Sequence, residues 1–354
     1  MVFGKSSSRC KNNDNNIVGQ GVLQGSSSDA PIFSLNSEIS LCAYNKSVIG
    51  ASFCHPVNGS IITDHSIQYV DDTSQFLNNL GAMNHIPPEQ ELNHPSLLQL
   101  ATKNSQKWAD LMWMSGGNLN LGKCFFYAFQ PSINYKSNTI CYYKIPSDSG
   151  ISITNPATGA DVVLQSLNPD DSCHTLGVIL SPDGQGKTHL KITLNKAKEF
   201  YGKFMNSSVS QKAKWAAIST VLEPAIIYPL VNSYFSMENI KPIDSILSQM
   251  KCVALGLNRH FPRVILHGPL LLGGLGIPSS LEKNAKDRLN YFLFNTRCPS
   301  TISLKFDISI VYTQIEIGTF EQFFSTSYHE YGHLVFLSYC VQIRQEMEPQ
   351  GIIV

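Results

Sequence analysis

Two adjacent carboxylates stand in the tetrapeptide Tyr69-Val70-Asp71-Asp72. A strand-like run, residues 66–70, leads into them, and a second run, residues 74–77, follows. A tight turn between two such runs would hold both carboxylates at the tip of a β-hairpin, where they could bind divalent cations. Because Asp is also common in solvated turns, the pair by itself does not decide between a metal site and a plain turn.

A second pattern with chemical meaning is His329-Glu330-Tyr331-Gly332-His333. Two histidines one helical turn apart beside a glutamate base are typical of zinc peptidases. The glycine in this pattern disfavours a helix by about 1 kcal/mol relative to Ala. A third ligand would have to come from Glu346 or Glu348. A zinc metallopeptidase acting through this motif is therefore kept as an alternative function, and the aromatic residues on either side of it favour packing against neighbouring helices.

Length and composition predict a globular protein of two or three domains, since the chain has 354 residues, 43% of them hydrophobic and 15% charged. The formal net charge is zero, but its distribution is uneven. Residues 47–102 contain five acids and no Lys or Arg, whereas residues 187–214 contain seven lysines and one acid. This order suits a metal site followed by a polyanion-binding surface. A solvated, lysine-rich helical face explains the basic segment equally well.

The cysteines indicate a reducing compartment, because all nine stand singly and no C-x-x-C pair occurs. No signal peptide and no apolar run long enough to span a bilayer is found in the sequence. We therefore expect an intracellular protein, nuclear or cytoplasmic, without a membrane partner. The sequence makes no prediction of the oligomeric state.

Periodicity predicts an α+β module followed by a helical one. Helices are expected after Pro31, over residues 95–115 up to Gly116-Gly117, and from residue 187 onward, with a capping box at Ser279-x-x-Glu282. The expected strands are 48–53, 59–63, 66–77, 119–129, 139–144, 151–153, 161–165 and 174–180.

Several motifs in fixed order around the Asp-Asp pair resemble a reverse transcriptase of the non-LTR (LINE-like) retrotransposon type. Residues 21–31, Gly-Val-Leu-Gln-Gly-Ser-Ser-Ser-Asp-Ala-Pro, are similar to the palm loop in which Gln-Gly precedes small residues and a proline. The Tyr-Val-Asp-Asp run matches the metal-binding hairpin of this family. The segment from Trp108 through Gly116-Gly117 to Lys123 is similar to the helix, glycine turn and lysine that follow it.

The resemblance continues downstream and covers about residues 19–280. Leu176-Gly177-Val178 is similar to the hairpin that supports the primer in this family. Residues 191–229 resemble the thumb, and residues 267–277 resemble the segment that follows the thumb.

The resemblance implies RNA-directed DNA synthesis from an RNA template, a DNA primer and deoxynucleotides, by two-metal nucleotidyl transfer with Mg²⁺, for which Mn²⁺ can substitute. It assigns metal binding and catalysis to Asp71 and Asp72, and assistance to the departing pyrophosphate to Lys123. The implied template and nucleotide contacts are Gln24, Gly25, Tyr69 and Val70. The implied contacts to the primer and its template are Leu176, Gly177, Lys191, Lys198 and Lys203.

The resemblance also implies a domain order. Residues 1–18 are expected to be a disordered or truncated end, and residues 19–182 an incomplete polymerase palm made of an antiparallel sheet with helices. Residues 183–280 would form an α-helical thumb, and residues 281–354 a helical extension.

One feature of the family is missing from the sequence. These polymerases take a further metal-binding aspartate from a strand that precedes the Gln-Gly loop, but the eighteen residues before Gly19 contain one acid, Asp14, in a polar run. The fingers are missing as well. Two carboxylates without the third leave the metal ions under-coordinated. We therefore predict a reverse transcriptase fragment that is not a competent polymerase on its own, with a non-catalytic nucleic-acid-binding relic as the alternative.

Overall fold

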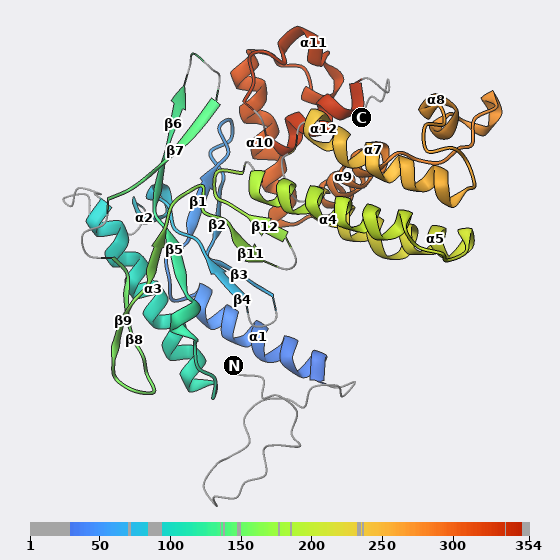
Figure 1. Ribbon diagram of the computed structural model, residues 1–354. Helices are drawn as coiled ribbons and strands as arrows, with labels where there is room; N and C mark the ends of the chain where they lie inside the picture. Colours follow the sequence, from blue (N-terminus) through green and yellow to red (C-terminus); the bar gives the residue numbers. More distant parts are fainter. Residues whose placement is uncertain are drawn as a thin grey trace, which may run out of the picture. The chain divides into compact units, whose positions relative to one another are not determined.

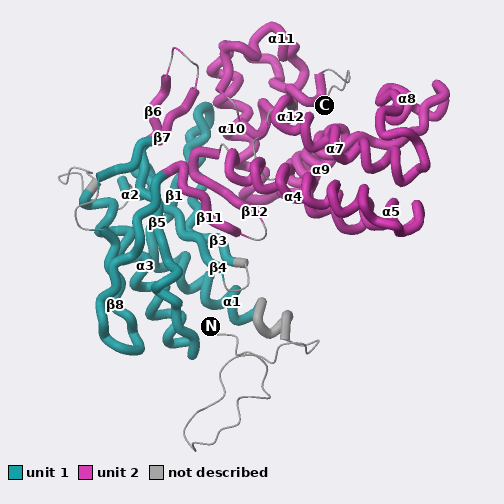
Figure 2. Tube along the Cα trace, in the orientation of Figure 1, with its two compact units in different colours: residues 1–130, 143–168 teal, residues 131–142, 169–354 magenta. Residues whose placement is uncertain are grey.

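The computed structural model (Figure 1) describes residues 29–69, 72–83, 94–134, 136, 139–146, 150–175, 178–184, 186–231, 235, 237–336 and 338–348. Its fold is α+β, as the periodicity predicts, with the described strands in the first half of the chain and helices thereafter. The chain divides into two compact units, coloured separately in Figure 2. Unit 1 combines the chain up to Gln130 with Tyr143–Asn168, and unit 2 combines Pro131–Tyr142 with the chain from Pro169 onward.

Unit 1 contains three α-helices and a series of short strands within its described residues. The helices are α1 (Asp29–Asn45), α2 (Asn79–Met83) and α3 (His94–Met114), and the 3₁₀ turn η2 is Leu121–Lys123. The strands are β1 (Ala51–Cys54), β2 (Ile61–Asp64), β3 (Ser66–Tyr69), β4 (Asp72–Gln75), β5 (Phe125–Tyr127), β8 (Ser152–Thr154), β9 (Asp161–Val163) and β10 (Gln165–Leu167). Strands β6 (Phe129–Asn134) and β7 (Thr139–Lys144) pair where the chain passes from unit 1 to unit 2 and returns.

The described strands form six separate two-stranded sheets, which differs from the single antiparallel sheet that was predicted. The pairs β1–β2, β3–β4 and β8–β9 are antiparallel, as is the pair of β11 (Cys173–Thr175) with β12 (Val178–Leu180). Strands β5 and β10 are parallel, with Phe125 opposite Gln165. A parallel pair needs a long crossover, here residues 128–164, and the local strand pattern carries no information about such a distant partner.

The core of unit 1 joins its two long helices. Tyr44 of α1 and Trp108 of α3 are buried, and their rings meet edge to face with centroids 5.2 Å apart. Val48 and Met112 complete this cluster. The contact fixes α1 beside α3, and α1 also packs against β3.

Glycine ends α3 where the sequence predicts. Gly116 adopts a left-handed backbone with φ of 83°, and its N–H donates to the carbonyl of Trp113. The N–H of Gly117 reaches back to the carbonyl of Met112, which satisfies a second carbonyl in the last turn. The predicted strand over 119–129 begins only at Phe125, because residues 121–123 first form the 3₁₀ turn η2.

Unit 2 is mainly helical within its described residues. Its strands are β11 (Cys173–Thr175) and β12 (Val178–Leu180). Its α-helices are α4 (Lys187–Met205), α5 (Gln211–Ala217), α6 (Glu223–Val231), α7 (Met237–Ala254), α8 (Arg263–His267), α9 (Ser280–Arg297), α10 (Thr301–Ile317), α11 (Tyr328–Tyr331) and α12 (Tyr339–Met347). The short turns are the π-helical η3 (Ile218–Leu222) and the 3₁₀ turns η4 (Leu270–Leu272) and η5 (Phe323–Ser325).

Two apolar clusters hold unit 2 together. One is formed by α4, α6 and α7, with Ile226, Leu230 and Leu247 completely buried. The other is largely aromatic and is centred on Phe292 of α9 and Phe323 of η5. Helix α12 lies inside unit 2, since seven of its nine residues are buried.

None of the helices in the described part of the chain is long and apolar enough to cross a bilayer. The eight cysteines among the described residues are free thiols.

The predicted capping box of α9 is present. Ser279 Oγ accepts the N–H of Glu282 at 3.0 Å, and the Glu282 carboxylate accepts the N–H of Ser279 at 3.2 Å. We expect Ser279→Ala to lower the free energy of unfolding of the chain by about 1 kcal/mol, because the substitution leaves the N–H of Glu282 without its acceptor. Urea denaturation followed by circular dichroism measures this. The matched control is Ser208→Ala, an exposed position outside any helix; an equal loss in both variants would contradict the role of the cap.

Candidate functional site

The Asp-Asp motif lies at the end of a regular hairpin. Strands β3 and β4 pair antiparallel, with Ser66 opposite Gln75 at the base and Tyr69 opposite Asp72 at the far end. The N–H of Phe76 donates to the carbonyl of His65, which extends the ladder by one pair at the base. Val70 and Asp71 join the two strands but lie outside the described residues. The predicted hairpin is therefore confirmed, with Asp72 as its last paired residue.

The face of the hairpin that turns inward is polar and is hydrogen-bonded to both long helices. Ser66 Oγ donates to Asn45 Oδ1 at the end of α1, at 2.9 Å. On the other strand, Ser105 Oγ of α3 donates to Gln75 Oε1 at 3.3 Å. These bonds fix the base of the hairpin to α1 and α3, so that its orientation depends on the helix pair.

The opposite face of the hairpin is open and carries an apolar residue. Ile67 is 58% exposed and stands directly opposite Ser74. Residues two apart along a strand share a face, so Asp72 lies on the same side as Ser74 and Ile67. Asp72 is also exposed. This is the reverse of the usual arrangement, in which the buried face of a sheet is apolar and the solvated face polar.

Lys123 lies on the turn η2 after the glycine stop of α3. Its backbone N–H donates to the carbonyl of Asn120, Leu121 at the start of the turn is buried, and the Lys123 side chain is exposed. Neither Lys123 nor Asp72 forms an ion pair within the described part of the chain. Both residues belong to unit 1, and the structure does not join them in a hydrogen bond.

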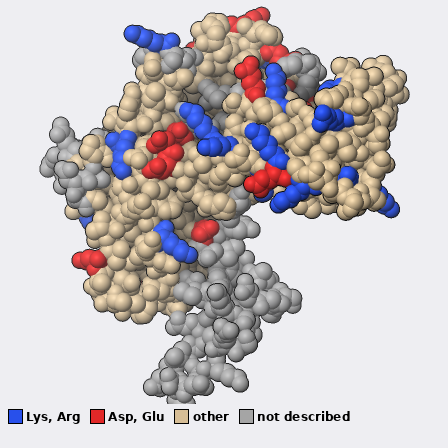
Figure 3. Space-filling view, viewed as in Figure 1, with Lys and Arg blue, Asp and Glu red and all other residues tan. Residues whose placement is uncertain are grey.

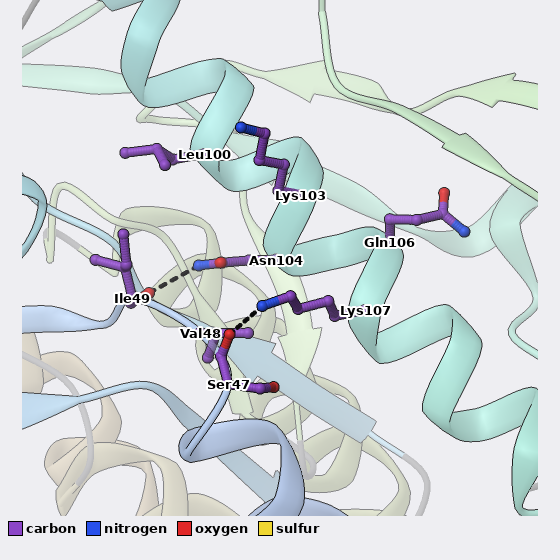
Figure 4. Close-up of a pocket in the computed structure, with 8 residues that line it drawn as sticks. All are labelled: Ser47, Val48, Ile49, Leu100, Lys103, Asn104, Gln106 and Lys107. Atoms are coloured by element: carbon purple, nitrogen blue, oxygen red, sulfur yellow. Dashed lines mark hydrogen bonds between the residues drawn. The ribbon is translucent and has the colours of Figure 1, made fainter. Parts of the chain in front are cut away.

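A shallow hollow of about 400 Å³ lies between α3 and the segment that leads into β1 (Figure 4). Two of its polar side chains hold that segment. Asn104 Nδ2 donates to the carbonyl of Ile49 at 2.7 Å, and Lys107 Nζ donates to the carbonyl of Ser47. The hollow is therefore part of the support of β1, and its lining residues do not include Asp72 or Lys123.

A second hairpin opens unit 2. Strands β11 and β12 pair with Thr175 opposite Val178, so Leu176 and Gly177 join the strands, although they lie outside the described residues. His189, buried near the start of α4, holds this hairpin: its Nδ1 accepts the N–H of Ile179 at 2.9 Å. Because Nδ1 accepts a hydrogen bond, the ring is neutral with its proton on Nε2.

The exposed lysines of α4 lie on two separate flanks. The core face of the helix includes Ala197 and Phe204. His189, Lys196 and Lys203 are spaced by seven residues and follow one flank, whereas Lys191 and Lys198 lie about 140° around the helix from them. On the face shown in Figure 3, Lys and Arg side chains are interspersed with acids, so no uninterrupted basic surface covers that face. The structure thus separates Lys191 and Lys198 from Lys203, and places Lys196 beside the residue that holds the hairpin.

The described residues do not make up a two-metal site. Of the predicted pair, Asp72 is described and Asp71 lies outside the described residues. Within the ranges that the structure describes, no three His, Cys, Asp or Glu side chains gather closely enough to hold a metal ion. Gln24 and Gly25, predicted to contact template and nucleotide, also lie outside the described residues, as does the side chain of Tyr69.

The histidine motif near the end of the chain does not form one continuous helix. Helix α11 covers only Tyr328–Tyr331, and His333 follows it in a turn. A side chain at Gly332 would stand 2.6 Å from the ring of Tyr328, so the glycine permits close packing there. Tyr331 is buried in the aromatic cluster and donates to the carbonyl of Phe323 at 3.2 Å. The geometry that a zinc peptidase motif requires, two histidines on successive turns of one helix, is not present.

Sequence reasoning missed His189 and the polar bonds that hold the β3–β4 hairpin. A single histidine on a lysine-rich helix carries no local signal, because its partner N–H belongs to a strand ten residues away. On β3 the polar residues face the helices and the apolar residue faces outward. The alternation behind this is visible in the sequence, where Ser66 and Gln68 stand on either side of Ile67. Neither a protein-family model nor a curated protein matches this chain in sequence.

The histidine that holds the second hairpin should make unit 2 sensitive to acid. Burial lowers the pKa of His189 below its usual value of 6.5, and the nearby His174 and Lys196 lower it further. The unfolded chain therefore takes up a proton near pH 6.5 while the folded chain does not, so this contribution to stability is complete above pH 6.5 and falls as the pH drops.

We expect the unfolding temperature of the chain to fall between pH 7 and pH 5, and to fall less in His189→Gln, whose amide oxygen can still accept the Ile179 N–H but does not titrate. Thermal unfolding at both pH values measures this. His260→Gln, at an exposed histidine, is the control. If the His189→Gln variant kept the full pH dependence, the acid sensitivity would have another source.

Proposed function

We propose that this chain carries the later palm elements and the thumb of an RNA-directed DNA polymerase of the retrotransposon reverse transcriptase type, and that by itself it binds primer–template without extending it. Unit 1 would supply the Asp-Asp hairpin. Unit 2 would supply the hairpin and helix that support the primer.

The observation that carries the proposal is the construction of the β3–β4 hairpin. A polymerase needs its Asp-Asp hairpin fixed from beneath and open above, where primer, template and nucleotide lie. In this chain Ser66 and Gln75 bond the hairpin to two helices, and Ile67 and Asp72 remain exposed on the other side.

The start of unit 2 supports the same function. A support for a primer end has to be rigid, and His189 and the strand pairing of β11 with β12 provide that rigidity. Along the flank of α4 that continues from His189, the exposed Lys196 and Lys203 are two turns apart. Two lysines on one flank can contact phosphates of the same nucleic-acid backbone, which release counterions when they are neutralised.

We propose that catalysis by a polymerase of this type requires more carboxylates than these residues provide. Two-metal nucleotidyl transfer distributes the ions over several oxygen ligands. The described part of the chain contributes Asp72 and no group of three ligands. The proposal for the isolated chain is therefore nucleic-acid binding, and polymerase activity is proposed for an enzyme in which a further aspartate completes the site.

We expect the chain to bind an RNA–DNA hybrid with an affinity that falls steeply as salt concentration rises, because binding releases counterions. Lys196→Glu with Lys203→Glu should weaken binding more than Lys191→Glu with Lys198→Glu, and should reduce the slope of log K against log salt by about two, about one for each phosphate contact. Fluorescence anisotropy across a salt series measures both quantities. The two double variants are matched, since both change two exposed lysines of α4 to the same residue.

Equal losses in the two double variants would contradict the assignment of the binding flank. Binding that does not depend on salt, or no binding at any salt concentration, would contradict the nucleic-acid-binding function itself.

We expect no extension of a DNA primer on an RNA template when the chain is supplied with deoxynucleotides and Mg²⁺ or Mn²⁺, because the carboxylate set is incomplete. Resolution of the products on a denaturing gel, beside a reaction without enzyme, measures this. Extension above that control would contradict the expectation. In that case loss of activity in Asp71→Asn, with a partial loss in Tyr69→Phe, would still identify the hairpin as the catalytic centre. Unchanged activity in Asp71→Asn would exclude the hairpin as the catalytic centre.

A further inference from the structure

Unit 2 displays a cluster of exposed aliphatic side chains that the proposed function does not use. Leu270, Leu271 and Leu272 of η4 are 74%, 98% and 84% exposed, and Val264 of the adjacent α8 is 85% exposed. We call these four residues the leucine knob. Four large apolar side chains this exposed within nine residues of chain are uncommon on a monomeric protein, and large exposed apolar surfaces mark interaction sites.

The knob is held in one shape by backbone hydrogen bonds. The N–H of Leu275 donates to the carbonyl of Ile265 at 2.8 Å, and the N–H of Gly276 donates to the carbonyl of Gly268 at 2.9 Å. Gly274 lies so close to this segment that a side chain there would stand 2.1 Å from the Gly268 carbonyl oxygen. The leucines are therefore presented by a tightly built loop.

A partly buried side-chain network supports the loop. His267 Nδ1 lies 2.7 Å from the carbonyl oxygen of Ile277, and its Nε2 lies 3.1 Å from Ser248 Oγ on α7. Ser248 is buried. The imidazole thus joins both ends of the loop to α7, which makes the knob a pre-organised surface with little conformational entropy to lose when it is covered.

The surroundings of the knob are basic. Residues 245–281 contain no Asp or Glu. Arg263 is the first residue of α8, and Arg259 precedes it by one turn. Arg263 Nη1 contacts Cys252 Sγ at 3.1 Å, and its Nη2 donates to the carbonyl of Arg259, so the two arginines are held together. A partner for the knob should therefore combine an apolar hollow with a negative charge.

The same unit provides a hollow of that description. Between α6 and α9 lies a groove of about 520 Å³, lined by Ile227, Tyr228, Val231, Tyr291 and Asp287 among others. We call it the tyrosine groove. Lys283 at its edge lies 3.7 Å from the Glu223 carboxylate, whereas Asp287 forms no ion pair within the described part of the chain. The groove has the size at which protein pockets take apolar side chains.

We propose that the leucine knob of one copy of this chain docks into the tyrosine groove of a second copy. The apolar side chains would be removed from water, and the arginine pair would approach Asp287. Knob and groove are different surfaces of one unit, so the contact is heterologous. Such a contact produces a ring when its rotation closes and an open chain of copies when it does not.

Sedimentation velocity of the full chain over a range of concentrations tests the proposal. We expect species larger than a monomer in the parent, their loss in Leu271→Asp and in the second knob variant Val264→Asp, and their loss in the groove variant Asp287→Lys. Leu271 and Val264 are exposed and Asp287 is half-buried in the lining of the groove, and none of the three belongs to the buried core, so circular dichroism should be unchanged. Leu304→Asp, at a residue of α10 that is 51% exposed, is the control and should associate like the parent.

Mixing the variants provides the sharper test. A heterologous contact uses the knob of one copy and the groove of the other, so Leu271→Asp mixed with Asp287→Lys should recover one contact and form a dimer, although each variant alone is monomeric. A monomeric parent at every concentration, association that persists in Leu271→Asp, or no dimer in the mixture would overturn the proposal. Flotation of a monomeric parent with phosphatidylserine vesicles, lost in Leu271→Asp, would also overturn it and assign the knob to an anionic lipid surface.

Discussion

The edge-to-face contact between Tyr44 and Trp108 is the interaction on which the candidate site depends. It joins α1 to α3 in the core of unit 1, and the β3–β4 hairpin is hydrogen-bonded to both of these helices. A change in the angle between the helices would therefore move Asp72. Burial also raises the pKa of Tyr44, so the phenol stays neutral inside the core. The position of the hairpin tip therefore depends on the two helices that hold the base of the hairpin.

Unit 2 depends on buried charges as well as on apolar packing. Arg288 of α9 is completely buried; its Nη2 donates to the carbonyl of Leu230 at 2.8 Å, and its Nε lies 3.6 Å from Glu346 of α12. Burial raises the pKa of Glu346, and Arg288 opposes that rise. Removal of one partner from such a pair is more harmful than replacement of both, because it leaves an unpaired buried charge. The residues after 281 belong to the same compact unit as the helices before them, and Figure 2 draws this unit in a single colour.

Prediction from sequence succeeded where the signal is local. The apolar period of residues 95–115, the glycines after it and the Ser279–Glu282 box all act within one or two helical turns, and α3 and the cap of α9 follow them closely. The hairpin around the Asp-Asp pair was also local, since its strands are adjacent in the chain. Prediction was less successful for sheet pairing, because the partner of Phe125 is forty residues away (165 − 125) and nothing near Phe125 specifies it.

The sequence by itself determined the types and order of the elements, the two hairpins that contain the candidate motifs, and the contrast between an acidic first segment and a basic second one. Only the tertiary structure decided which face of each element is covered. It directed Ser66 and Gln75 towards the helices and left Ile67 exposed, and it ended α11 before His333. The physical reason is that composition and period fix local conformation, whereas the choice of a buried face depends on partners that are distant in the chain.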